Sequence, residues 1–480
     1  MTKNTGFVLG SGILNKVFSF FFIAYAARVL GPHDFGLYAL IGTFTFLVSF
    51  FGNLGIEPVA IREIAKDRTK ANELFNDVLS LRIGLVVLAY PLIVLGLNLL
   101  GYGDDLKYLI YISGFTAIFH TFSASFGILY IAFERFKIPS LISILVSFLS
   151  TVAHILVLYL GYGLKGIVWV LFAGSLFGAL ISGIWIRRKI IKYKFAFNLS
   201  RFKDLISQSV PFAILAFFQQ LSNTHLNILL LSKLPGPLPG GVAIGYYNPA
   251  SSVCRIALMF SDSFRLAALP TVSSNAGNLK VIRGIITKST ESLLVLIIFP
   301  LVLATSFFPK EIIHLIFGTA YMISAPVLTI LGWAYALNVF NTPVTLTLSV
   351  SREIKRFIPW LMLLFCINLI LAVPLIIYYG FFGAAIAFLV TKILETLVRS
   401  HLLKTIWGIK RLDMEPSLVK AFMPMVIIIS VIFLARLSSV NTVGLLVLTS
   451  TLYLSYVFSL KSFRRGTIAL ISSLKERGSN

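Results

Sequence analysis

Apolar runs of about 20 residues, separated by short polar connections, make up most of this chain. An α-helix advances about 1.5 Å per residue, so each run is long enough to cross the hydrocarbon core of a bilayer. Within that core only helices and closed barrels satisfy every backbone hydrogen bond, and unbroken apolar runs favour helices. The pattern therefore predicts an all-α integral membrane protein with about 14 transmembrane helices.

Composition excludes the soluble classes. With 58% hydrophobic and 12% charged residues, the chain carries too much apolar surface for a soluble enzyme. The expected spans are residues 8–30, 36–60, 78–100, 107–133, 139–160, 166–186, 205–231, 243–270, 285–308, 323–350, 357–379, 383–403, 418–435 and 442–460.

The formal charge of +23 would favour nucleic acid as the partner of a soluble protein. Here most Lys and Arg residues lie on the N-terminus, the even-numbered connections and the C-terminal tail. The positive-inside rule then predicts a multi-pass protein of the cytoplasmic membrane with both termini in the cytoplasm, and no nucleic-acid partner. The richest connection, residues 187–203, is interpreted as a topology determinant, with attraction of anionic lipid head groups as the alternative.

A weak internal repeat divides the chain. Three pairs share an offset of 209 residues: Gly36 with Gly245, Tyr38 with Tyr247, and Pro91 with Pro300. Because six spans are an even number, the halves have the same orientation and are related by a pseudo-two-fold axis along the membrane normal. We expect a first six-helix lobe at 1–190, a basic linker at 191–204, a second six-helix lobe at 205–407, and two additional helices with a basic tail at 408–480.

The eighth span carries Arg255, Asp262 and Arg265 at spacings of seven and three residues, which places them on one helical face. A charge at the bilayer centre costs about 2.5 to 3.5 kcal/mol, so such a face is expected to line a water-filled cavity. An ion pair between neighbouring helices is the alternative. Polar stripes on the first, second and seventh spans favour the cavity, with interhelical hydrogen bonding as their alternative.

The cationic excess of this predicted cavity suits an anionic ligand. Its candidate substrate-binding residues are Asn15, Lys16, Asn53, Gln219, Asn223, Asn227, Arg255 and Arg265. Glu57, Asp262 and Glu395 are candidates for ion coupling, and an ion-pair role is the alternative for each. No catalytic residue, metal site or cofactor is predicted, and the chain contains no GxxxxGK[ST] loop.

Two segments carry a family resemblance. Residues 28–39 read RVLGPHDFGLYA, and residues 317–328 begin FGTAY and end APVL. Both segments resemble the corresponding connections of the Wzx-type polysaccharide and O-antigen flippases, which belong to the multidrug/oligosaccharidyl-lipid/polysaccharide exporter superfamily.

The resemblance implies a flippase that moves polyprenyl-(pyro)phosphate-linked oligosaccharides across the cytoplasmic membrane by alternating access. It also implies that the chain is not an enzyme, that membrane lipids surround it, and that glycosyltransferases or a polymerase of the same pathway are its partners. Coupling to an H⁺ or Na⁺ gradient or to the membrane potential would provide direction.

Two other classes stay open. A cation-coupled multidrug exporter of the same broad fold would more naturally present buried carboxylates than the Arg and Lys found here. A multispan glycosyltransferase or ligase would need a substantial extramembrane loop with catalytic carboxylates, but the odd-numbered connections are short.

Overall fold

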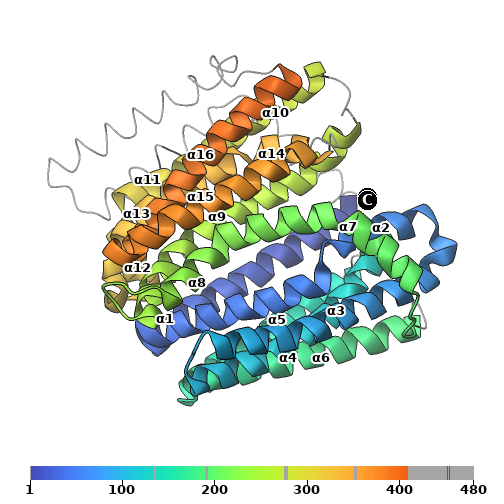
Figure 1. Cartoon of the computed structure of the whole chain (residues 1–480), viewed down its shortest axis with the longest axis horizontal. Coiled ribbons are helices and arrows are strands. Elements are labelled where there is room, and N and C mark those ends of the chain that lie inside the picture. Colours follow the sequence, from blue (N-terminus) through green and yellow to red (C-terminus); the bar gives the residue numbers. More distant parts are fainter. Residues whose placement is uncertain are drawn as a thin grey trace. The chain divides into compact units, whose positions relative to one another are not determined.

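The computed structural model describes residues 2–133, 137–189, 193–274, 279–350 and 354–408, together with residues 451 and 453. All regular elements in these ranges are helical, as Figure 1 shows. The prediction of an all-α membrane fold is therefore confirmed for the described part of the chain.

The helices follow one another through short turns. The first eight are α1 (Thr2–Asn53), α2 (Ile56–Lys66), α3 (Ala71–Leu99), α4 (Asp104–Ala132), α5 (Lys137–Tyr159), α6 (Gly163–Lys189), α7 (Leu199–Gln220) and α8 (Leu226–Lys233). The others are α9 (Gly240–Ser274), α10 (Leu279–Leu293), α11 (Phe299–Phe307), α12 (Pro309–Phe317), α13 (Ala325–Phe340), α14 (Thr342–Val350), α15 (Ile354–Tyr379) and α16 (Phe381–Trp407). Two π-helical segments, Leu221–His225 and Leu294–Ile298, join α7 to α8 and α10 to α11.

Helix α1 contains the first two expected spans and is interrupted between them. Gly31 has a φ of 71° and a ψ of 174°, and the following Pro32 lacks a backbone N–H. The rings of Phe22 and Tyr38 lie 5.9 Å apart, whereas 16 residues of continuous helix would separate them by about 24 Å. The chain therefore folds back at Gly31, and the two spans are separate helices.

Among the described residues, ten helical segments are long and apolar enough to cross a membrane, and the first of them, Gly10–Lys66, includes both halves of α1. Helix α9 matches the expected eighth span in position and length but is too polar to belong to this set. The expected spans 418–435 and 442–460, like nearly all of the predicted region 408–480, lie outside the described residues.

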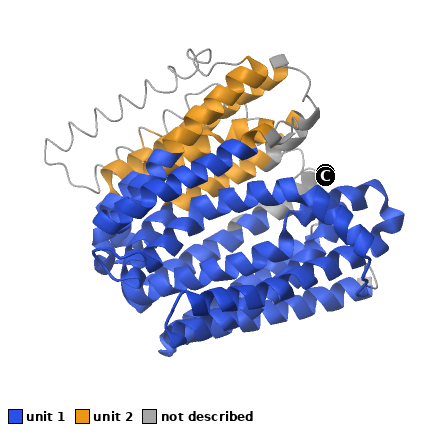
Figure 2. Cartoon of the chain, viewed as in Figure 1, with its two compact units in different colours: residues 1–253, 310–330, 358–391 blue, residues 254–309, 331–357, 392–480 orange. Residues whose placement is uncertain are grey.

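The chain forms two compact units, coloured separately in Figure 2. Unit 1 comprises residues 1–253, 310–330 and 358–391, and unit 2 comprises 254–309, 331–357 and the residues from 392 onward. These units are not contiguous in sequence, so the predicted lobes at 1–190 and 205–407 stay a prediction.

Each unit has its own apolar core. In unit 1, α2, α3 and α4 bury side chains such as Ile64 and Phe75, and the Phe75 ring lies 5.8 Å from that of Phe126. In unit 2 the core includes Phe299 and Val339. The opposite face of α3 exposes leucines at positions 88, 92, 95 and 99, a stripe with helical spacing that suits contact with lipid tails.

Candidate functional site

The two segments that carry the family resemblance contact each other in unit 1. The Arg28 guanidinium donates from Nε to the Ile316 carbonyl at 3.0 Å and from Nη2 to the Leu315 carbonyl. These carbonyls belong to the last turn of α12. Carbonyls in the last turn of a helix have no backbone N–H partner within that helix. Arg28 thus caps α12 from 287 residues away in the sequence.

Aromatic side chains complete this contact. The Tyr321 hydroxyl donates to the Ala27 carbonyl at 2.7 Å. The Phe35 ring is 6.2 Å from Tyr321 and 6.5 Å from Phe317, and all three side chains are buried. The residues that made these two segments recognisable therefore form one packed cluster at the end of the helices that the charge pattern assigns to the outer side.

Glycines of the internal repeat also meet in unit 1. A Cβ placed on Gly36 would lie 1.8 Å from the Gly241 carbonyl oxygen, and a Cβ on Gly245 would lie 1.8 Å from the Pro32 carbonyl oxygen. Both contacts pair residues that exchange under the same 209-residue offset. This reciprocity is what a two-fold axis produces, and it requires glycine because the backbones touch.

The second and seventh spans share a buried polar contact. Thr43 Oγ1 lies 3.0 Å from His225 Nδ1, and the Phe46 ring stacks on the imidazole at 4.1 Å. His225 closes the π-helical segment that also contains Asn223. Such π-bulges occur frequently at functional sites. No sequence pattern predicted the π-helix, and Thr43 is not among the predicted site residues.

Three of the predicted cavity amides have an unusual feature. The side-chain oxygens of Asn15, Asn53 and Asn227 are buried and receive no hydrogen bond within the described part of the protein. The Asn15 Nδ2 donates to Ser143 Oγ at 2.6 Å. Because buried acceptors are normally satisfied, these oxygens are suited to donors that the protein itself does not supply, such as water or hydroxyl groups.

The remaining predicted residues of unit 1 differ in exposure. Lys16 is exposed, whereas Gln219 and Asn223 are half-buried. Asn227 is buried, and its Nδ2 donates to the Tyr247 hydroxyl at 2.9 Å and to the Ala384 carbonyl at 3.3 Å. The structure thus places Asn227 between helices, where its amide nitrogen has a packing role.

The charged face of α9 lies in unit 2. Arg255 is half-buried, and Arg265 and Asp262 are exposed with 3.5 Å between Nη2 and Oδ1. An exposed pair of this kind contributes less than about 1 kcal/mol to stability. It supports the ion-pair alternative for Asp262 and leaves the Arg265 guanidinium accessible from solvent.

Buried Arg82 and half-buried Glu57 occupy the region where the second span ends. Arg82 Nε donates to the Gly52 carbonyl at 3.2 Å. Arg82 is not among the site residues predicted from the sequence. Glu57 belongs to the first turn of α2, where the helix dipole favours a carboxylate.

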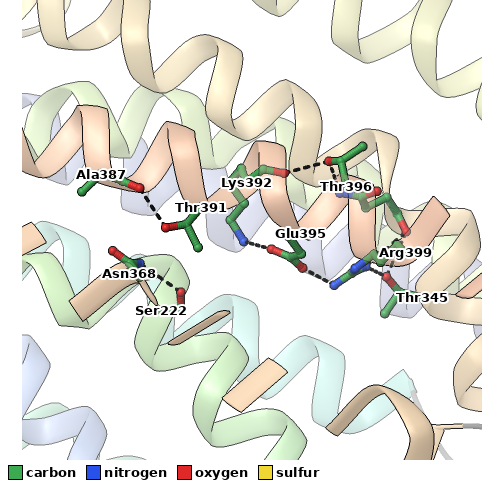
Figure 3. A network of polar contacts seen from close by, with 10 residues as sticks. Ser222, Thr345, Asn368, Ala387, Thr391, Lys392, Glu395, Thr396 and Arg399 are labelled. Carbon is green, nitrogen blue, oxygen red and sulfur yellow. Dashed lines mark hydrogen bonds and ion pairs between the residues drawn. The ribbon is translucent and has the colours of Figure 1, made fainter. Parts of the chain in front are cut away.

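Glu395 lies between two cations of α16, as Figure 3 shows. Lys392 Nζ is 2.6 Å from Glu395 Oε2, and Arg399 Nη2 contacts Glu395 Oε1. All three side chains are buried, with 3%, 7% and 4% of their surface exposed for Lys392, Glu395 and Arg399. The position of Glu395 between two cations favours an ion-pair role, which is the alternative to ion coupling for this residue.

The same network stabilises a break between two helices of unit 2. Asn341 separates α13 from α14, and its Nδ2 donates to Thr396 Oγ1 at 2.8 Å. Arg399 donates to the Asn341 carbonyl at 3.3 Å and to the Thr345 hydroxyl, and its guanidinium stacks over the Phe357 ring at 4.8 Å. The Asn341 carbonyl also accepts from the Thr345 backbone N–H at 3.0 Å, so Arg399 adds a second donor from α16 at the break.

A cavity of about 460 Å³, with charged side chains in its lining, opens where α7 begins, beside the turn between α2 and α3. Its lining includes Glu63, Asp67, Lys70 and Arg201. Hydrogen bonds from the Thr69 hydroxyl and amide lower the pKa of Asp67, because they stabilise its ionised carboxylate. This cavity has mixed charge, unlike the cationic cavity predicted from the stripes. In the described ranges, no three His, Cys, Asp or Glu side chains are arranged to hold a metal ion.

Comparison with known proteins identifies relatives of this chain. An uncharacterized membrane protein of Methanocaldococcus jannaschii is 24% identical over 82% of this chain and 95% of its own length. The probable low-salt glycan biosynthesis flippase Agl15 of Haloferax volcanii is 27% identical over 35% of this chain and 36% of its own length.

Solved structures share the fold. The lipid II flippase MurJ in an inward closed conformation superposes with a TM-score of 0.74 and 18% identity, covering 98% of this chain and 100% of MurJ. An inward-facing multidrug resistance transporter of the MATE family superposes with a TM-score of 0.66 and 14% identity, covering 84% of this chain and 95% of the transporter.

The family model described as polysaccharide biosynthesis protein matches residues 1–276, more than half of the chain. That range includes the Arg28–Ala39 segment, the reciprocal glycines and the whole charged face of α9. The chain belongs to the polysaccharide biosynthesis protein family.

Proposed function

We propose that this protein is a flippase that moves polyprenyl-(pyro)phosphate-linked oligosaccharides from the cytoplasmic to the outer leaflet of the cell membrane. Membership of the polysaccharide biosynthesis family, similarity to a probable glycan biosynthesis flippase and the fold of a lipid II flippase support this proposal. The reaction breaks no covalent bond, so the protein acts as a transporter and not as an enzyme.

The charged face of α9 is the observation that carries the proposal. A half-buried Arg255 and an accessible Arg265 on a 35-residue helix provide forked donors that match phosphate oxygens. Lys16 adds an exposed cation on α1. A phosphate group needs such cations because moving a charge through hydrocarbon without a partner is prohibitively costly.

The buried amide oxygens serve the second part of the substrate. Half-buried Asn15 and Asn53 have side-chain oxygens that receive no hydrogen bond from the described residues, and sugar hydroxyls are donors of the right kind. Gln219 and Asn223 on the seventh span extend this polar lining. The sugar part then exchanges water for protein hydrogen bonds while the prenyl tail stays in lipid.

Transport is driven by an H⁺ or Na⁺ gradient or by the membrane potential, without a cofactor. One elementary charge crossing about 100 mV provides about 2.3 kcal/mol. Among the candidate carboxylates, we assign coupling to Glu57, which interacts electrostatically with Arg82 of α3, whereas Glu395 and Asp262 pair with cations of their own helices. Both termini face the cytoplasm, and glycosyltransferases or a polymerase of the pathway supply and consume the lipid-linked glycan.

Transbilayer movement of a polyprenyl-pyrophosphate oligosaccharide in proteoliposomes tests the proposal. Losing one charged hydrogen bond costs about 1.5 to 3 kcal/mol, so Arg255→Ala/Arg265→Ala should slow movement more than tenfold. Leu369→Ala, at a position 37% exposed on α15, is the control. Equal rates for the two variants at equal abundance contradict the cationic site, and efflux of cationic drugs by the intact protein would favour the multidrug alternative.

A further inference from the structure

The linker between α6 and α7 is held against α3 as an extended segment. The Lys194 backbone N–H donates to Asn76 Oδ1 at 2.9 Å, and the Ala196 backbone N–H donates to Ser80 Oγ at 2.8 Å. Residues 193–198 are not helical, and the chain enters α7 at Leu199. Alternate backbone amides thus face α3.

The end of this linker is fixed as well. Asn198 Oδ1 accepts from the Arg201 backbone N–H at 3.2 Å and caps α7. The Arg201 side chain donates to Asp77 at 2.8 Å and also to Glu73. The four acceptors on α3, at positions 73, 76, 77 and 80, lie on one helical face, so α3 holds the linker along its length.

The linker presents large apolar side chains away from this attachment. Phe195, Phe197 and Leu199 are 59%, 82% and 84% exposed. In an extended chain, residues two apart lie on the same side, so Phe195 and Phe197 share one side of the linker. Leu199, the first residue of α7, continues this exposed apolar ridge. Phe195 and Phe197 lie between the apolar spans Gly163–Arg188 and Leu199–Lys233, outside both. Such a ridge is unfavourable in water and marks a contact surface.

Basic side chains flank the ridge. Arg187 and Arg188 near the end of α6, Lys194 within the linker and Lys203 in α7 are all exposed. Aromatic and apolar groups beside Lys and Arg are the composition of segments that lie in the membrane interface and bind anionic lipids. The basic residues thus have a second role beyond setting the topology.

We propose that the ridge formed by Phe195, Phe197 and Leu199 inserts into the cytoplasmic leaflet, where the flanking Lys and Arg bind the head groups of anionic phospholipids. The surface includes none of the proposed substrate residues, and the proposal rests only on the proposed cytoplasmic orientation of this linker. Because the linker is bonded to α3 and continues into α7, bound lipid acts on both helices.

Site-specific fluorescence tests this interaction. Phe197→Cys is labelled with bimane in the full chain carrying Cys254→Ala and Cys366→Ser, and reconstituted in phosphatidylcholine with increasing phosphatidylglycerol. The label should resist an aqueous quencher severalfold better than the same label at Lys70→Cys, a 74% exposed position on the turn before α3. Depth-dependent quenching by brominated lipids should place it in the upper acyl region.

The anionic preference is tested by Lys194→Gln, which keeps the backbone bond to Asn76. It should raise the phosphatidylglycerol fraction needed for half-maximal protection about fivefold, equivalent to about 1 kcal/mol per basic residue. Equal quenching at positions 197 and 70 overturns the proposal, as does protection that appears only with an added protein. The readout does not involve transport, so its failure is distinguishable from failure of the flippase assignment.

Discussion

Replacing Glu395 with Gln tests the buried charge network of α16. The substitution keeps the shape of the side chain but leaves Lys392 and Arg399 without their carboxylate, at positions only 3% and 4% exposed. Breaking a buried pair by removing one partner costs about 3 to 5 kcal/mol, because an uncompensated charge stays buried. We expect Glu395→Gln to lower the free energy of unfolding by about that amount.

The chain contains a matched control for this change. Glu63 and Lys66 form a pair with the same i, i+3 spacing at 3.0 Å, but their side chains are 32% and 63% exposed. Exposed pairs contribute about 0 to 1 kcal/mol, so Glu63→Gln should have a small effect. The difference in free energy of unfolding between the two variants therefore reports the effect of burial, because both pairs join Glu and Lys three residues apart.

Unfolding of the purified protein in mixed micelles by increasing SDS, followed by circular dichroism, measures both variants. The reasoning is refuted if Glu395→Gln is no more destabilising than Glu63→Gln. Unchanged stability together with a lost pH dependence of transport would instead identify Glu395 as a titrating residue that couples an ion to transport.

Three further substitutions use the same unfolding measurement. Gly36→Ala should cost about 1 to 3 kcal/mol of stability, because its Cβ would overlap the Gly241 carbonyl. Gly84→Ala has open space around it and should be neutral or stabilising. Equal effects of the two variants would show that the helices separate easily. Arg28→Gln leaves two carbonyls of α12 without their donor and should cost about 1 to 3 kcal/mol, and an unchanged midpoint would mean that water replaces the guanidinium. Arg201→Met leaves the buried Asp77 carboxylate unpaired. It should therefore lower stability more than Glu73→Gln, because the Glu73 side chain is 60% exposed. The opposite order would contradict the attachment of α7 to α3.

Local patterns in the sequence predicted the elements well. The length of the apolar runs located the helices, including α9, because a span needs about 20 apolar residues whatever surrounds it. The Gly31–Pro32 pair marked the break between the first two spans. The glycine repeat was visible as an offset of 209 residues, although its meaning as a direct backbone contact was not.

The candidate site was predictable only in part. The spacing of Arg255, Asp262 and Arg265 revealed a charged face, but only the structure showed that Asp262 and Arg265 pair and that Glu395 is enclosed by two cations. Periodicity reports which residues share a face of one helix. It carries no information on which other helix that face meets.

By itself, the sequence determined the membrane class and the positions of the helices, because hydrophobic length and periodicity act within one helix at a time. The family was recognisable from the resemblance carried by residues 28–39 and 317–328. Tertiary structure alone decided that Arg28 caps a helix nearly 300 residues away, that Thr43 meets a π-helical His225, and that the linker lies along α3 with its apolar ridge exposed. These features depend on contacts between distant segments, whose free energies come from burial and hydrogen bonding that arise only after the helices have packed.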